Sequence, residues 1–238
     1  MKKSLVALIP ARKGSERLKN KNIVLLAGKP LIAHTISAAL KTKIFDQIIV
    51  STDSRKYASI AKKYGAEVPF LRPKIFSKSN SPDFEWVNYT LKKIEKRFTH
   101  YFILRPTNPF RTHRTIIRAW KEFKKIKNID SLRAVELCKQ HPNKMWIINK
   151  KKIIPLLKIN KKKQPLYNSQ YKTLPRIYVQ NASLEISRIN VLKKFKTITG
   201  KNIMPFFTKK YEGYDINYKN DLEQAKDIVK KNSRKLFG

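Results

Sequence analysis

The sequence has little cysteine, no long hydrophobic run and neither of the common nucleotide-binding fingerprints. A single cysteine, Cys138, in 238 residues cannot form an internal disulfide or a cysteine metal cluster, so a reducing, cytoplasmic setting is expected. No segment approaches the roughly 20 apolar residues that a membrane-spanning helix needs, so no membrane partner is expected. The P-loop pattern and the Gly-rich dinucleotide pattern are both missing.

Acidic residues are also scarce. The chain has 16 Asp and Glu against 54 Lys and Arg, which gives a formal net charge of +38. Such a chain attracts anions, but its 41 lysines and 13 arginines are spread along the whole length instead of forming a basic tail. No zinc finger, RNA-recognition signature or basic heptad region accompanies them, so we expect non-specific nucleic-acid binding at low salt and no specific nucleic-acid partner.

The first half of the sequence alternates short apolar runs with amphipathic stretches, which predicts an α/β fold with a mostly parallel sheet. The expected strands span residues 5–9, 48–51, 68–71, 101–104 and 131–137. The expected helices span residues 30–40, 54–64, 83–98 and 112–127, with Ser54 and Thr112 as helix-start residues and Gly65 ending the second helix.

The second half is less regular. Residues 140–172 lose their periodicity and become rich in Lys, Asn, Pro and Gln, so we expect an arm or lid at about residues 140–175 within one domain spanning residues 1–238. Strands at 177–179 and 184–186 are expected to flank residues 180–183. A short helix, a strand at 205–207 and a closing helix at about 221–231 follow.

The loop after the first strand, residues 10–22, is a candidate anion site. Loops at the carboxyl end of a first parallel strand bind nucleotides in α/β sheets. Gly14 and Ser15 would allow close backbone approach, and the cations of the loop could brace a triphosphate; they are Arg12, Arg17, Lys19 and Lys21. The alternative is a solvated basic loop in a chain that is basic throughout.

Five segments in order carry a resemblance to a known family. Residues 9–22 read I-P-A-R-x-G-S-x-x-L-x-x-K-N, and the other four segments are G-K-P-L-I-A-H-T-I at 28–36, F-D-Q-I-I-V-S-T-D at 45–53, L-R-P at 71–73 and L-R-P-T-N-P-F-R-T at 104–112. Together they resemble the acylneuraminate cytidylyltransferase family, the CMP-sialic acid synthetases and their relatives. The resemblance extends over nearly the entire chain.

The resemblance implies a Rossmann-like nucleotide-diphospho-sugar transferase fold, with helices on both faces of the sheet and a dimerisation arm. It implies transfer of CMP from CTP to a 2-keto-3-deoxy sugar acid of the N-acylneuraminate type, with release of pyrophosphate, by a homodimer. The same chemistry on Kdo, legionaminic or pseudaminic acid stays open, as does a degenerate member that binds CTP without turnover.

The resemblance also implies roles for individual residues. Arg12, Lys21 and Asp215 would be catalytic; the nucleotide would be bound by Arg12, Gly14, Ser15, Lys21, Asn22, Arg72 and Ser81. Two departures from the family pattern lie in the first loop, where Glu16 replaces a lysine and Lys19 a proline. Arg17 or Lys19 could replace the missing cation.

Asp215 and Asn217 would hold Mg²⁺ in a segment similar to the family's D-I-D, with Asn217 in place of the second aspartate. An amide oxygen can ligate Mg²⁺ but removes a negative charge. The alternative is that both residues only form a turn at the end of a strand.

The sugar acid would be bound by Arg105, Lys144, Gln180 and Asn181. Arg105 stands where the family commonly has glutamine, Tyr171 where it has arginine, and Ala182 where it has glycine. Arg105 could supply a lost partner for the carboxylate, since arginine binds planar acids through two hydrogen bonds, or it could mark a different sugar acid.

Overall fold

The computed structural model describes residues 4–94, 96–157, 164–232 and 236–237. Its contacts divide the chain into two compact units, one formed by residues 1–134 and 181–238 and the other by residues 135–180. The expected arm at about 140–175 falls within the second unit.

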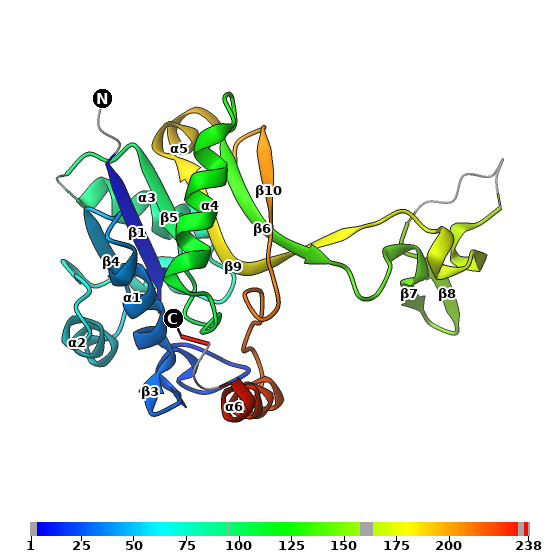
Figure 1. The fold of residues 1–238 in the computed structure, drawn as a ribbon. Coiled ribbons are helices and arrows are strands. Elements are labelled where there is room, and N and C mark those ends of the chain that lie inside the picture. Colours follow the sequence, from blue (N-terminus) through cyan, green and yellow to red (C-terminus); the bar gives the residue numbers. More distant parts are fainter. Residues whose placement is uncertain (1–3, 95, 158–163, 233–235, 238) are drawn as a thin grey trace. The chain divides into compact units, whose positions relative to one another are not determined.

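A six-stranded sheet forms the centre of the first unit, with strand order β10-β6-β9-β5-β1-β4 (Figure 1). Its strands are β1 (Leu5–Pro10), β4 (Gln47–Ser51), β5 (His100–Ile103), β6 (Ser131–Leu137), β9 (Tyr178–Arg188) and β10 (Ile203–Phe207). β1 pairs in parallel with β4 and with β5, whereas β9 is antiparallel to β5. The carboxyl ends of β1, β4 and β5 therefore lie at one edge, where a ligand site is expected.

Helices cover both faces of this sheet. They are α1 (Leu31–Thr42), α2 (Arg55–Lys63), α3 (Asp83–Lys93), α4 (His113–Lys125), α5 (Ile189–Phe195) and α6 (Lys219–Asn232). Alternate residues of β1 face opposite ways because side chains of a strand alternate between its faces. Leu5, Ala7 and Ile9 pack in a core with α1, α2 and α4, while Val6 and Leu8 pack in a second core with α3 and α5.

A third apolar cluster joins α6 to the chain that precedes α1. A small hairpin of β2 (Leu25–Leu26) and β3 (Lys29–Pro30) turns through Ala27 and Gly28, both with positive φ. Leu26 packs with Leu222 and Ala225 of α6. Short 3₁₀ turns occur at η1 (Lys21–Ile23) and η2 (Lys74–Phe76).

The second unit contains a hairpin that the sequence analysis missed. Strand β7 (Trp146–Asn149) pairs antiparallel with β8 (Lys152–Pro155), and the 3₁₀ turns η3 (Pro142–Lys144), η4 (Leu166–Asn168) and η5 (Tyr171–Thr173) accompany it. Two isoleucine pairs, at 147–148 and 153–154, were the available signal for this hairpin, because β-branched residues favour strands. The lysines between and around them obscured the pattern.

Most expected elements are confirmed, including the α/β class with helices on both faces. Ser54 and Thr112 accept hydrogen bonds at the starts of α2 and α4, from the amides of Tyr57 and Thr115. Gly65 follows α2 at a φ of +92°, a left-handed conformation that glycine adopts without strain.

Three expectations were wrong. No strand forms at residues 68–71; only Glu67 bridges to Ile49, because Pro69 has no N–H to continue a ladder. The helix expected to reach residue 98 ends at Lys93, and Ile94 turns to an extended conformation and packs against the second core. The strands expected at 177–179 and 184–186 form one continuous strand, β9.

None of the helices in the described part of the chain is long and apolar enough to cross a lipid bilayer.

Candidate functional site

A cavity of about 450 Å³ opens at the carboxyl end of β1. Its lining includes most of the sequence-predicted residues, namely Arg12, Ser15, Lys21, Asn22, Arg72, Ser81, Arg105, Asp215 and Asn217. Glu16, Arg17, Lys78, Asp83, Trp86 and Thr107 also line it. The cavity lies entirely within the first unit.

The loop after β1 is held by its neighbours. The amide of Ala11 donates to the carbonyl of Ser51, and the amide of Lys13 donates to Asp53 Oδ1 at 2.8 Å. Asn22 is buried and its Nδ2 donates to the carbonyl of Arg12 at 3.0 Å. Asn22 therefore fixes the backbone that carries Arg12 at the cavity.

Two cations of the cavity lining contact Asn217. Lys21 Nζ donates to Asn217 Oδ1 at 2.9 Å, and Arg17 donates to the same oxygen at 3.2 Å. Burial lowers the pKa of Lys21, and the nearby charges of Asp215 and Arg17 act in opposite directions. Of the two proposed substitutes for the missing loop cation, Arg17 lines the cavity and Lys19 does not.

Asp215 has the oxygen that suits a divalent ion. Its Oδ2 accepts from Asn217 Nδ2, whereas its Oδ1 is buried without a hydrogen-bond partner among the described residues. A buried carboxylate oxygen without a donor fits a hard cation. To bind the ion, Asn217 Oδ1 would have to give up its hydrogen bonds from Lys21 and Arg17. The described residues contain no group of three or more His, Cys, Asp or Glu suited to a metal, so further ligands must come from elsewhere.

The cavity lining also contains a buried arginine. Arg72 Nε donates to Ser51 Oγ at 3.0 Å, and its guanidinium carbon lies 4.9 Å from the centroid of the Trp86 ring. Burial lowers the pKa of Arg72 to about 10. Ser81 lies nearby in the lining, where its hydroxyl donates to the carbonyl of Ile75 at 2.9 Å.

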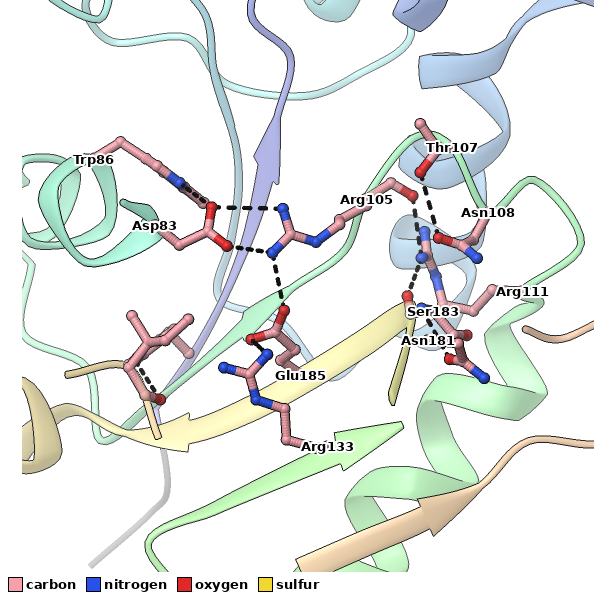
Figure 2. Close-up of polar contacts among 12 residues, drawn as sticks. Asp83, Trp86, Arg105, Thr107, Asn108, Arg111, Arg133, Asn181, Ser183 and Glu185 are labelled. Atoms are coloured by element: carbon pink, nitrogen blue, oxygen red, sulfur yellow. Dashed lines mark hydrogen bonds and ion pairs between the residues drawn. The ribbon is translucent and has the colours of Figure 1, made fainter. Parts of the chain in front are cut away.

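Arg105 is enclosed by carboxylates (Figure 2). It binds Asp83 through both terminal nitrogens and donates to Glu185 Oε1 at 3.0 Å, while Arg133 contacts the other oxygen of Glu185 at 2.9 Å. Trp86 Nε1 also donates to Asp83 Oδ1 at 2.7 Å. Two positive and two negative side chains form this network, so its formal charge is zero.

The pKa values of this network reflect that pairing. Burial by itself would lower the pKa of Arg105, but the charges of Glu185 and Asp83 outweigh it and raise the pKa. Burial would raise the pKa of Asp83, but Arg105 outweighs it and lowers the pKa. Both groups therefore stay ionised at neutral pH.

The remaining sequence-predicted residues lie elsewhere. Gly14 and Asn181 belong to the first unit but are outside the cavity lining; Asn181 Nδ2 donates to Thr208 Oγ1 at 2.9 Å. Lys144 and Gln180 belong to the second unit. There Lys144 Nζ donates to the carbonyls of Tyr167 and Ser169, and Gln180 is exposed.

Sequence reasoning missed Asp83, Trp86 and Glu185. The i, i+3 spacing of Asp83 and Trp86 in a predicted helix was the available signal, because such residues share a helix face. Nothing local connects either of them to Glu185.

Sequence comparisons find similar proteins among curated enzymes. The chain is 29% identical to an N-acylneuraminate cytidylyltransferase of Escherichia coli. The alignment covers 98% of this chain and 54% of that relative. It is 47% identical to a CMP-N,N'-diacetyllegionaminic acid synthase of Legionella pneumophila over 48% of its length and 51% of the relative's. The chain thus spans about half the length of these curated relatives.

Solved structures show the same fold. CMP:2-keto-3-deoxy-manno-octonic acid synthetase complexed with CTP superposes with a TM-score of 0.71 at 16% identity, over 96% of this chain and 99% of that one. A 4-diphosphocytidyl-2C-methyl-D-erythritol synthase from Anaerococcus prevotii gives 0.65 at 12% identity, with the same shares covered. The family model described as cytidylyltransferase matches residues 6–236. This chain therefore belongs to the cytidylyltransferase family.

Proposed function

We propose that the chain transfers CMP from CTP to a 2-keto-3-deoxy sugar acid of the sialic type and releases pyrophosphate. One observation carries the proposal. A cavity at the carboxyl end of β1 combines clustered cations, an aspartate with a buried oxygen that lacks a hydrogen-bond partner, and a buried arginine beside a tryptophan. The family match and the names of the relatives support it.

In this proposal Arg12, Arg17 and Lys21 bind the phosphates, with the loop backbone at Gly14 and Ser15 approaching them closely. Cations there stabilise the negative charge that moves to the leaving pyrophosphate. Asn22 contributes by holding the carbonyl of Arg12. Arg72 and Ser81 would lie on the cytosine side of the cavity.

The reaction is an in-line displacement. The anomeric hydroxyl of the sugar acid loses its proton to water, and its oxygen forms a bond to the α-phosphorus of CTP. The bond from that phosphorus to the oxygen that bridges it to the β-phosphate breaks, and this oxygen leaves with pyrophosphate. Mg²⁺ would neutralise charge on the phosphate oxygens when bound. Asp215 Oδ1 would hold the ion, with Asn217 as the second proposed ligand.

We propose an N-acylneuraminate as the acid. Legionaminic, pseudaminic and Kdo acids are the alternative substrates that the test below distinguishes. The relatives include an enzyme named for legionaminic acid and two named pseudaminic acid cytidylyltransferase, from Campylobacter jejuni. Arg105, Asn181, Lys144 and Gln180 are the proposed sugar-acid residues.

A second copy of the chain is the proposed partner. The hairpin of the second unit exposes Ile148 by 77% and Ile153 by 59%, although the two face each other across the strands. Exposed apolar surface of this kind usually marks an interface. We propose that the hairpin packs against a second copy in a homodimer.

The deciding experiment measures pyrophosphate release from CTP and Mg²⁺ with a panel of 2-keto sugar acids. We expect release with at least one acid, and a rate about 100-fold lower for Arg12→Ala, because a phosphate-bracing cation is lost. The matched control is Lys13→Ala, which removes an exposed cation outside the cavity and should leave the rate unchanged.

Failure has two distinct forms. If the wild type binds CTP but releases no pyrophosphate with any acid, the chain is a degenerate CTP-binding protein. If Arg12→Ala retains the wild-type rate, the phosphate role of the loop is wrong even though the chain is an enzyme.

A further inference from the structure

Asp215 lies in a segment without helix or strand. Residues 208–218 connect β10 to α6, and no sheet ladder within them fixes the carboxylate. The placement of Asp215 therefore depends on individual contacts made by this connection. One is made by Glu212, which forms an ion pair with Arg118 of α4 and accepts from Thr115 Oγ1 at 2.8 Å.

The backbone on both sides of Asp215 is held by the loop after β5. Asn108 Nδ2 donates to the carbonyl of Tyr214 at 3.0 Å and to that of Gly213 at 3.4 Å. On the other side of Asp215, the amide of Ile216 donates to the carbonyl of Thr107 at 2.9 Å. Asp215 is thus bracketed by hydrogen bonds to two consecutive residues of one loop.

Asn108 is itself rigidly placed. It is fully buried, and Thr107 Oγ1 lies 3.5 Å from its Oδ1 (Figure 2). Arg111, also buried, donates to the carbonyl of Arg105 at 3.2 Å and to Thr35 Oγ1 at 2.9 Å, which ties the loop to α1. The loop can therefore serve as a fixed support for the segment that carries Asp215.

We propose that Asn108 is a positioning residue that places Asp215 for the divalent ion. A carboxamide offers two N–H groups, which match the two carbonyls before Asp215, whereas serine offers one O–H and alanine none. Groups that orient metal ligands commonly change metal affinity by about 10-fold to 100-fold when removed.

The placement of Asp215 matters more here because the second proposed ligand, Asn217, carries no negative charge. Asn217 Oδ1 also already accepts hydrogen bonds from Lys21 and Arg17. The proposal rests on the proposed function for the divalent ion at Asp215 and for the identity of the bound nucleotide. Its readouts do not require turnover.

The test compares Asn108→Ala and Asn108→Ser with the wild type in the full chain. The matched control is Asn202→Ala, which removes an asparagine whose Nδ2 donates to the carbonyl of Asn128 at 3.1 Å, outside the cavity lining. Mn²⁺ serves as the metal probe, and its affinity for the CTP-bound protein is measured by electron paramagnetic resonance. Hydrogen exchange of the Ile216 amide is measured without ligands.

We expect Mn²⁺ affinity about tenfold lower and faster Ile216 exchange in Asn108→Ala, a smaller change in Asn108→Ser, and none in Asn202→Ala. Affinity for CTP without metal should stay within threefold of wild type, which separates positioning of Asp215 from general damage. If Asn108→Ala does not fold in a thermal unfolding scan, Asn108→Ser decides.

Two results would overturn the proposal. One is Mn²⁺ affinity and Ile216 exchange within threefold of wild type in the folded variants. The other is metal-free CTP affinity that falls as much as Mn²⁺ affinity. Absence of pyrophosphate release by the wild type would contradict the proposed function and leave both readouts of this test valid.

Discussion

Arg105 shows how neighbours decide the chemistry of a residue. From the sequence it is a free guanidinium suited to a substrate carboxylate, whereas in the structure Asp83 and Glu185 already bind it. A substrate carboxylate near Arg105 would meet the network of two arginines and two carboxylates, whose formal charge is zero. If Arg105 contacts the sugar acid as proposed, that carboxylate must compete with Asp83 and Glu185 for it.

The ion pair predicts a pH-dependent stability difference between the wild type and Asp83→Asn. Because the folded pKa of Asp83 is lowered, its stabilisation is fully present above the unfolded pKa near 3.8 and is lost as pH falls through the folded value. We expect Asp83→Asn to cost about 2 kcal/mol of unfolding free energy at pH 7. Urea unfolding at pH 7 and at about pH 3 measures this difference.

Lys226, which pairs with the exposed Glu223 within α6, provides the control. Lys226→Gln should change the unfolding free energy by less than about 0.5 kcal/mol, since exposed pairs contribute little. A cost for Asp83→Asn that is equal at pH 7 and pH 3 would show that the charge of Asp83 is not the source of its stabilisation.

At the scale of elements, local capping chemistry was the most reliable predictor. Ser54 and Thr112 were identified as helix starts because their side-chain oxygens can accept from the first free amides, and both do so. The incorrect strand at 68–71 arose from apolar residues interrupted by Pro69, where composition suggested a strand that the missing N–H prevents.

The cap at Ser54 gives a prediction for α2. Ser54→Ala removes the acceptor for the Tyr57 amide, 3.4 Å away, and should lower the unfolding free energy by about 1 kcal/mol. The control is Ser59→Ala, at an exposed position in the middle of the same helix. It should be neutral or slightly stabilising because alanine favours helix. Equal effects of the two substitutions in thermal or urea unfolding would contradict the capping role.

At the scale of the whole molecule, the net charge of +38 divides into a few cations at one cavity and many on the surface. Arg12, Arg17 and Lys21 converge where anionic phosphates are proposed to bind, so a positive cleft would raise the arrival rate of CTP. Lysines account for 41 of the 54 cationic residues and so carry most of the remaining charge, which predicts weak, salt-sensitive attraction to any polyanion.

If the hairpin forms the proposed homodimer interface, charged side chains introduced on it should prevent association. The double substitution Ile148→Asp and Ile153→Asp places two charges at a facing pair and should convert a dimer into a monomer in sedimentation equilibrium at micromolar concentration. Ile126→Asp, at an isoleucine that is 44% exposed at the end of α4, is the control and should leave the dimer intact. A wild type that sediments as a monomer would contradict the proposed dimer.

The sequence by itself determined the alternation of strands and helices, the helix caps and the loop that lines the cavity, because each depends on residues within a few positions of one another. It could not determine the pairing of side chains within the site. Asp83 lies 22 positions from Arg105, Glu185 lies 80 positions from it, and Asn108 contacts Tyr214 across 106 positions. Only the packing of the sheet, its helices and its connections brings these groups together, so their charges and hydrogen bonds were decided by the tertiary structure.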